Sequence, residues 1–138
     1  MKSLVVLIAS ALLVIGCAST EPVVAWQGSE PTQQISEAQF NQELFNAKAI
    51  PGAEIEESSI QTSIKVPNAP VNPTSYTLYI FTKPASYAHP AAARMTLQRA
   101  KSDGKGLDFR FLRVGDNPGF NKFVREISMV GLLFESVK

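Results

Sequence analysis

The chain has 138 residues, a formal net charge of +1 and 45% hydrophobic residues. This length accommodates one domain, and eight Phe, three Tyr and one Trp exclude a wholly disordered chain. With one Cys and one His, the composition excludes an internal disulfide framework and a multi-Cys zinc site, and it leaves little material for imidazole catalysis.

The first residues have the organisation of an export signal. Lys2 supplies a positive charge, and the run LVVLIASALLVI then occupies residues 4–15. A basic start followed by an apolar core of this length is typical of a signal peptide, and the core is shorter than the roughly 20 apolar residues of a membrane-spanning helix. We therefore expect residues 1–16 to be a cleaved signal peptide; the alternative is an uncleaved N-terminal anchor helix.

The end of this segment, Val14-Ile15-Gly16-Cys17, resembles the lipobox of bacterial lipoproteins. The resemblance implies that the Cys17 thiol carries a diacylglyceryl group, that the peptide is cut before Cys17, and that the new amine is acylated. Two or three acyl chains anchor a protein stably, whereas one does not. Because Ala18 follows the Cys in place of Asp, the resemblance implies an exported, membrane-anchored protein, which in a diderm source faces the periplasm from the outer membrane.

Residues 17–34 are expected to form the lipidated N-terminus and a flexible tether, because they contain two Pro and show no helical or strand period. A coil of this length reaches about 20–25 Å, which would hold a domain clear of the lipid headgroups. Val23, Val24 and Trp26 form an apolar insert in it. The insert either packs on its own domain or lies at the lipid interface, or it docks on a partner by strand addition.

The globular part is expected to begin with a helix. Ser36 and Gln39 make a capping box, and Ile35 and Phe40 make a hydrophobic staple around it. Pro51-Gly52 is a stop signal. We therefore expect one helix between these start and stop signals.

Strand signals and a second helix signal follow. Residues 60–66 alternate between apolar and polar, and residues 74–82 are apolar on both faces, which predicts a central strand. Pro90 at a first helical position, with Gly104 as a stop, predicts a second helix. Residues 107–112 alternate again, which predicts a third strand.

The C-terminal part follows a turn at residues 115–119. Apolar residues at helical spacing favour an amphipathic helix over 120–130, although alternation there also fits a hairpin strand. Residues 132–137 are expected to form a final strand. The order αββαβαβ predicts a single two-layer α+β domain over residues 35–138, with about four strands and three helices.

Few residues carry recognisable chemistry. His89 has no nucleophile motif near it, so we interpret it as a helix-entry or surface residue and not as a general base. Glu54, Glu56 and Glu57 form a carboxylate cluster that a solvated loop explains better than the paired acids of a glycosidase. We therefore expect no enzymatic activity, no cofactor and no metal site.

Charge is distributed unevenly along the chain. Residues 17–60 contain seven Glu and one Lys, whereas residues 61–138 contain eleven Lys and Arg against five acids. Either the acidic first helix lies against the basic second half, or a basic face is exposed to an anionic partner. The basic residues that we expect to bind such a partner are Arg94, Arg99, Lys101 and Lys105.

The sequence thus predicts a lipid-anchored, non-enzymatic accessory or binding module of the cell envelope, attached to the membrane through acyl chains on Cys17. Its partner is expected to be another envelope protein or an anionic envelope polymer, and not nucleic acid, which an exported domain does not meet. Two alternatives stay open. An apolar cavity would favour a carrier or capture domain for a hydrophobic or anionic envelope ligand, and two facing acids in a cleft would favour a small cell-wall hydrolase that uses carboxylates.

Overall fold

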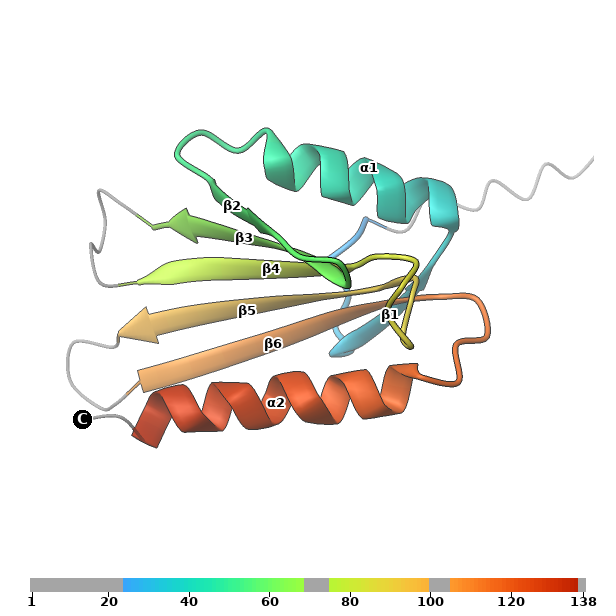
Figure 1. Ribbon diagram of the computed structural model, residues 1–138. Coiled ribbons are helices and arrows are strands. Elements are labelled where there is room, and N and C mark those ends of the chain that lie inside the picture. The colour runs from blue at the N-terminus through green and yellow to red at the C-terminus, as the bar shows by residue number, and fades with distance from the viewer. Residues whose placement is uncertain (1–23, 69–74, 100–104, 137–138) are drawn as a thin grey trace, which may run out of the picture.

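The computed structural model describes residues 24–68, 75–99 and 105–136. These residues form one sheet and two helices, and Figure 1 shows the helices on opposite sides of the sheet. The elements in chain order are β1 (Thr32–Ile35), α1 (Glu37–Lys48), β2 (Glu54–Glu57), β3 (Gln61–Pro67), β4 (Tyr76–Thr82), β5 (Ala91–Arg99), β6 (Lys105–Val114) and α2 (Phe120–Ser136). The predicted signal peptide, Cys17 and Val23 lie outside the described residues.

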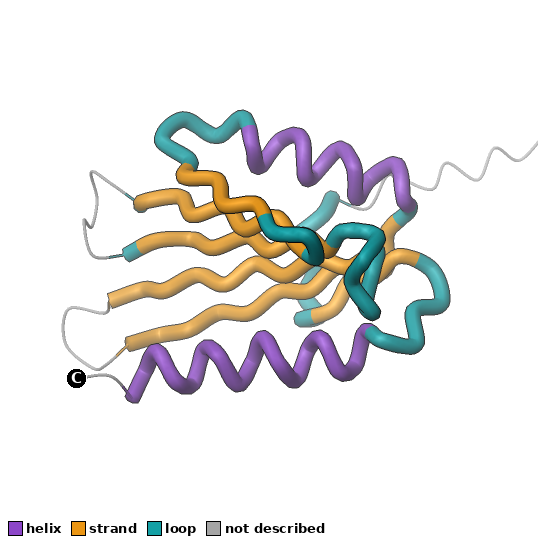
Figure 2. The backbone as a smooth tube through the Cα atoms, in the orientation of Figure 1, coloured by secondary structure: helices purple, strands orange, loops and turns teal. Residues whose placement is uncertain are grey.

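The six strands form one mixed sheet in the order β1-β6-β5-β4-β3-β2. β1 is parallel to β6, and the other neighbouring strands are antiparallel, because β2 to β6 follow one another along the chain as sheet neighbours. Between β1 and β2 the chain crosses from one edge of the sheet to the other through α1 (Figure 2). The first two strands are therefore the two edges of the sheet.

Each helix covers a different face of the sheet. Successive side chains in a strand point to opposite faces, and in β4 Phe81 packs with Phe40 of α1, whereas Ile80 belongs to the cluster of Phe120 and Phe123 of α2. We call these two sides the α1 face and the α2 face. The sheet thus separates two apolar clusters.

The predicted start of the first helix is confirmed. Gln39 N donates to Ser36 Oγ at 3.2 Å, and Ser36 N donates to Gln39 Oε1 at 2.9 Å, which completes the capping box. Ile35 and Phe40 are both buried in the cluster under α1. The strands predicted over 60–66, 74–82 and 107–112 are also confirmed as β3, β4 and β6, and β4 lies inside the sheet.

The helix predicted from Pro90 is wrong, because the residues that follow form β5, which pairs with β4 on one side and β6 on the other. The helical preference of alanine amounts to less than about 1 kcal/mol per residue, so packing overrides it. Ala93 lies opposite Ile80 on one neighbouring strand and opposite Phe111 on the other. Small side chains in β5 therefore fit between large ones on both sides.

The strand predicted over residues 132–137 is wrong as well. The helix predicted over 120–130 is confirmed, but it continues to Ser136. Gly131 lies so close to the sheet that a Cβ there would come 2.1 Å from Phe109 Cζ. The glycine therefore permits the close approach of α2 to β6.

The predicted two-layer arrangement of four strands and three helices is therefore wrong, although the domain is still α+β. The described residues contain six strands and two helices in the order βαβββββα, with a helix on each face of the sheet. The sequence does not indicate β1 and β2. β1 lies in the predicted tether, and the charged sequence of β2, Glu-Ile-Glu-Glu, is typical of a loop. Short or charged strands are typical of sheet edges, where they discourage pairing with other chains.

Candidate functional site

The chain enters the domain on the α1 face through residues that were assigned to the tether. Trp26 is only 8% exposed, and its ring meets the rings of Tyr79 and Phe81 edge-on at 5.9 and 6.4 Å between centroids. Its Nε1 donates to Glu43 of α1 at 2.9 Å. Val24, two residues earlier, is 57% exposed. Trp26, one of the three residues predicted to form a docking peptide, therefore lies in the core. The packed domain thus begins before β1.

Two arginines of β5 and β6 hold this entering segment against the sheet. Arg94 and Arg110 lie directly opposite each other in the strand register. The Arg94 guanidinium lies over the Trp26 ring, 5.5 Å from its centroid. Arg110 Nη1 donates to Gly28 O at 2.9 Å and to Glu30 O at 3.3 Å. Both side chains are thus fixed in place by the segment that they contact.

One aspartate is shared by the two arginines. Asp108 Oδ2 lies 3.9 Å from Arg94 Nη2 and 3.4 Å from Arg110 Nε. No other carboxylate in the described ranges lies within 4 Å of either guanidinium. Like charges directly opposite in a sheet repel each other, and one carboxylate balances only one of the two cations. The cluster therefore keeps a net positive charge.

These three residues line an open pocket of about 400 Å³, which we call the arginine pocket. Its other lining residues are Thr96, Gly106 and Leu107. Arg94 and Arg110 are each about a quarter exposed, so their guanidinium groups are accessible from solvent. The pocket offers several N–H donors in fixed directions, which suits an anionic group with oxygen acceptors.

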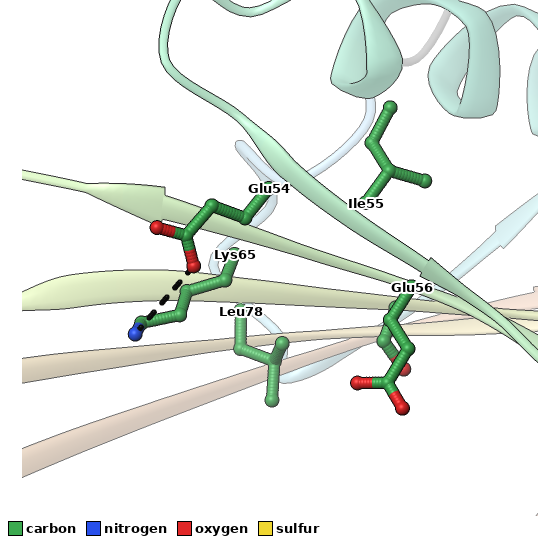
Figure 3. Close-up of a pocket in the computed structure, with 6 residues that line it drawn as sticks. Glu54, Ile55, Glu56, Lys65 and Leu78 are labelled. Carbon is green, nitrogen blue, oxygen red and sulfur yellow. Dashed lines mark ion pairs between the residues drawn. The ribbon is translucent and has the colours of Figure 1, made fainter.

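A second open pocket, of about 200 Å³, lies on the α2 face of β2, β3 and β4, and Figure 3 shows the residues that line it. Its lining residues are Glu54, Ile55, Glu56, Ser63, Lys65 and Leu78. Figure 3 shows Glu54 directed to Lys65, 3.8 Å away, and Glu56 set apart from that pair. The two acids share a face as strand residues, but they do not face each other across a cleft.

The third acid of the cluster, Glu57, is an ion-pair residue. Its Oε1 accepts from Lys48 Nζ of α1 at 2.6 Å and its Oε2 accepts from Lys83 Nζ at 2.7 Å. These hydrogen bonds lower the pKa of Glu57 from 4.5 to about 2. A general acid at neutral pH needs the opposite shift. Glu57 instead links the acidic first half of the chain to Lys83 in the basic second half.

His89 is packed into the loop between β4 and β5. Its Nδ1 donates to Thr82 O at 2.9 Å, and its ring lies edge-on to Phe40 with 5.8 Å between centroids. The Thr82 hydroxyl accepts from Ala91 N at 2.8 Å. These contacts connect the loop to the sheet and to α1.

The structure places Arg94 and Arg99, two of the four predicted basic residues, in the strand β5 and not in the helix predicted from Pro90. Arg94 lies in the arginine pocket, the backbones of Arg99 and Lys105 pair at the end of the β5–β6 hairpin, and Lys101 lies outside the described residues. Sequence reasoning missed Asp108 and Arg110. Their position two residues apart on one face of a predicted strand was the signal that could have found them.

Comparisons with family models, with curated proteins and with solved structures found no match to this chain. In the ranges that the structure describes, no helix is long and apolar enough to cross a membrane. The same ranges contain no group of three or more His, Cys, Asp or Glu side chains placed to hold a metal ion.

Proposed function

We propose that the protein is a lipid-anchored envelope protein whose domain is a non-enzymatic binding module kept at the membrane surface. The lipobox resemblance of Val14-Ile15-Gly16-Cys17 supplies the anchor. The observation that carries the proposal is the short stretch of chain between Cys17 and the packed domain, in which Trp26 is already buried.

The length of this stretch limits how far the domain lies from its anchor. Seven residues lead from Cys17 to Val24, and an extended chain spans at most about 3.6 Å per residue. Whatever conformation these residues adopt, the Cys17 and Val24 backbones are within about 25 Å of each other. Because Trp26 is already packed in the domain, fewer residues separate Cys17 from the domain than the tether expected over residues 17–34, which supports a function near the lipid surface.

The two alternative functions receive less support from the described residues. Glu54 is paired with Lys65, and Glu57 is paired with Lys48 and Lys83, so these acids are not poised for glycoside hydrolysis. A carrier of an apolar ligand needs an enclosed apolar site, whereas both pockets described above are open to solvent. A binding module with an open polar surface fits these observations better.

The anchor is tested with the full-length chain in a bacterial host that lipidates exported proteins. We expect radiolabelled palmitate in the wild-type protein, and neither label nor signal-peptide cleavage in Cys17→Ser. Ser19→Ala, which leaves the motif intact, is the matched control and should be labelled like the wild type. Palmitate in the Cys17→Ser variant would contradict the proposed anchor.

A further inference from the structure

We propose that the arginine pocket binds the phosphate group of an anionic phospholipid headgroup. The inference rests on the proposed function for its location at a membrane. It rests on the geometry of Arg94, Arg110 and Asp108 for its chemistry.

The charges of the arginine pocket are loosely paired. Asp108 lies 3.9 and 3.4 Å from the two guanidinium groups, whereas Glu57 lies 2.6 and 2.7 Å from its two lysines. Lys48 and Lys83 each form a short ion pair with one oxygen of Glu57. In the arginine pocket, the more distant Asp108 leaves N–H donors on both arginines available to a ligand. An incoming phosphate can therefore displace Asp108 without breaking a tight ion pair.

The guanidinium groups are also pre-organised. Arg94 lies over the Trp26 ring, and Arg110 donates to Gly28 O. Because these contacts restrict both long side chains, less conformational entropy is lost when a ligand binds. Arginine is the side chain best suited to phosphate, since its planar fork donates two parallel hydrogen bonds.

The position of the pocket favours a lipid as the source of the phosphate. Both arginines contact the segment through which the chain enters the domain, and the Cys17 backbone is within about 25 Å of Val24 in that segment. A domain held this close to a bilayer meets headgroups at high effective concentration, so a weak single-phosphate site is sufficient. The volume of about 400 Å³ is that of a small-molecule site and not of a polymer groove.

The test uses the mature chain from Cys17 onward, with its single Cys capped by iodoacetamide so that no anchor contributes. Binding is measured to vesicles of phosphatidylcholine with and without phosphatidylglycerol, at low and at physiological salt. Each cation near an anionic surface changes affinity about fivefold. We expect Asp108→Asn to bind phosphatidylglycerol vesicles about fivefold more tightly than the wild type, and Arg94→Gln about fivefold more weakly.

Arg113→Gln is the matched control, because it removes one cation from β6, the strand next to that of Arg94. Arg113 lies in the α2-face register of β6 and donates to Gln34 Oε1 at 2.9 Å. We expect this variant to bind like the wild type. Equal losses in Arg94→Gln and Arg113→Gln would indicate general surface attraction and overturn the proposal. An unchanged affinity in a folded Asp108→Asn variant would overturn it too, even if Arg94→Gln failed to fold.

A second arm identifies the source of the phosphate. Trp26 is the only Trp in the chain and lies under Arg94, so its emission reports an anion in the pocket. Glycerol phosphate and inorganic phosphate should each shift the emission weakly, and phosphatidylglycerol vesicles should shift it more. A response to inorganic phosphate without vesicle binding would assign the pocket to a free anion and overturn the lipid source. The capped chain carries no acyl group, so a failure of palmitate labelling would refute the anchor independently of this result.

Discussion

β5 and β6 present opposite chemistry to the two sides of the sheet. On the α2 face they carry buried small and apolar residues under the helix: Ala93, Met95 and Phe111. On the α1 face they carry the arginine pocket, which is covered in part by the entering segment around Trp26. The strand alternation thus lets two adjacent strands build a core on one side and an open polar site on the other.

The comparison separates stability from binding. Substitutions on the α2 face should lower the free energy of unfolding and leave anion binding unchanged in the folded molecules. Substitutions of Asp108 should change anion binding with little loss of stability. The Asp108 side chain is half exposed, and its oxygen lies 3.4 and 3.9 Å from the two guanidinium groups, so its ion pairs are weak.

The largest effect is expected at Trp26, which belongs to both regions. Trp26→Ala removes a ring that packs against Tyr79 and Phe81 and lies under Arg94, so we expect a loss of about 3 kcal/mol in the free energy of unfolding. Urea unfolding followed by circular dichroism measures this loss. The neighbouring Val24→Ala variant, at an exposed position, should change stability by less than about 0.5 kcal/mol. If the two variants were equally stable, Trp26 would not be a core residue, and the alternative that it docks on a partner would be favoured.

The second effect concerns the helix that covers the α2 face. Gly131→Ala gains up to about 1 kcal/mol of helix propensity, but its Cβ would come 2.1 Å from Phe109 Cζ. Overpacking of this kind costs about 1–3 kcal/mol, so we expect net destabilisation in thermal unfolding and an unchanged vesicle affinity. Met129→Ala, at a position that is 65% exposed on the same helix, is the control and should be nearly neutral. A stabilised Gly131→Ala variant would mean that α2 lies farther from β6.

A smaller effect is expected where α1 begins. Ser36→Ala removes the hydroxyl that accepts from Gln39 N, and the loss of such a cap costs about 0.5–2 kcal/mol. The exposed Ser59→Ala serves as control and should leave the urea midpoint unchanged. The two midpoints decide whether the cap contributes to stability. An unchanged midpoint in Ser36→Ala would show that it does not.

The features that could be predicted from the sequence are local ones. The capping box requires only Ser36 and Gln39 three residues apart, and β3 and β6 follow from alternation within a few residues. β5 was mistaken for a helix because its alanines have a helical preference, and its strand state depends on Ile80 and Phe111, which are distant in the chain. The prediction for β5 was therefore wrong because non-local packing determines its structure.

Only part of the candidate site could be predicted, because the rest of it also depends on non-local contacts. Arg94 is expected from the sequence to bind an anionic partner, but the sequence predicts a helix where the structure has the strand β5. Its partner Arg110 was missed because the two arginines meet only through the register of β5 and β6. Trp26 was recognised as unusual for a tether, yet its burial depends on Tyr79 and Phe81 of β4.

The last and smallest effect contrasts the loosely paired arginine pocket with the tightly paired Glu57 at the β2 edge. The pKa of Glu57 is lowered from 4.5 to about 2 by Lys48 and Lys83. A lowered pKa means that the ion pairs contribute stability above pH 4.5 and that this contribution is lost as the pH falls through 2. Because the Glu57 side chain is 45% exposed, salt screens the pairs and the contribution is modest.

Glu57→Gln should therefore lower the thermal midpoint slightly at neutral pH and flatten its fall between pH 4.5 and 2. The difference from the wild type should shrink at high salt. Glu56→Gln removes the same charge from the neighbouring position of β2, which is exposed and has no ion pair within the described ranges, so its acid profile should follow the wild type. If both variants flatten the profile equally, net charge and not the lysine pairs governs acid stability. In neither variant should Trp26 emission respond differently to phosphate, because the arginine pocket lies on β5 and β6, away from the β2 edge.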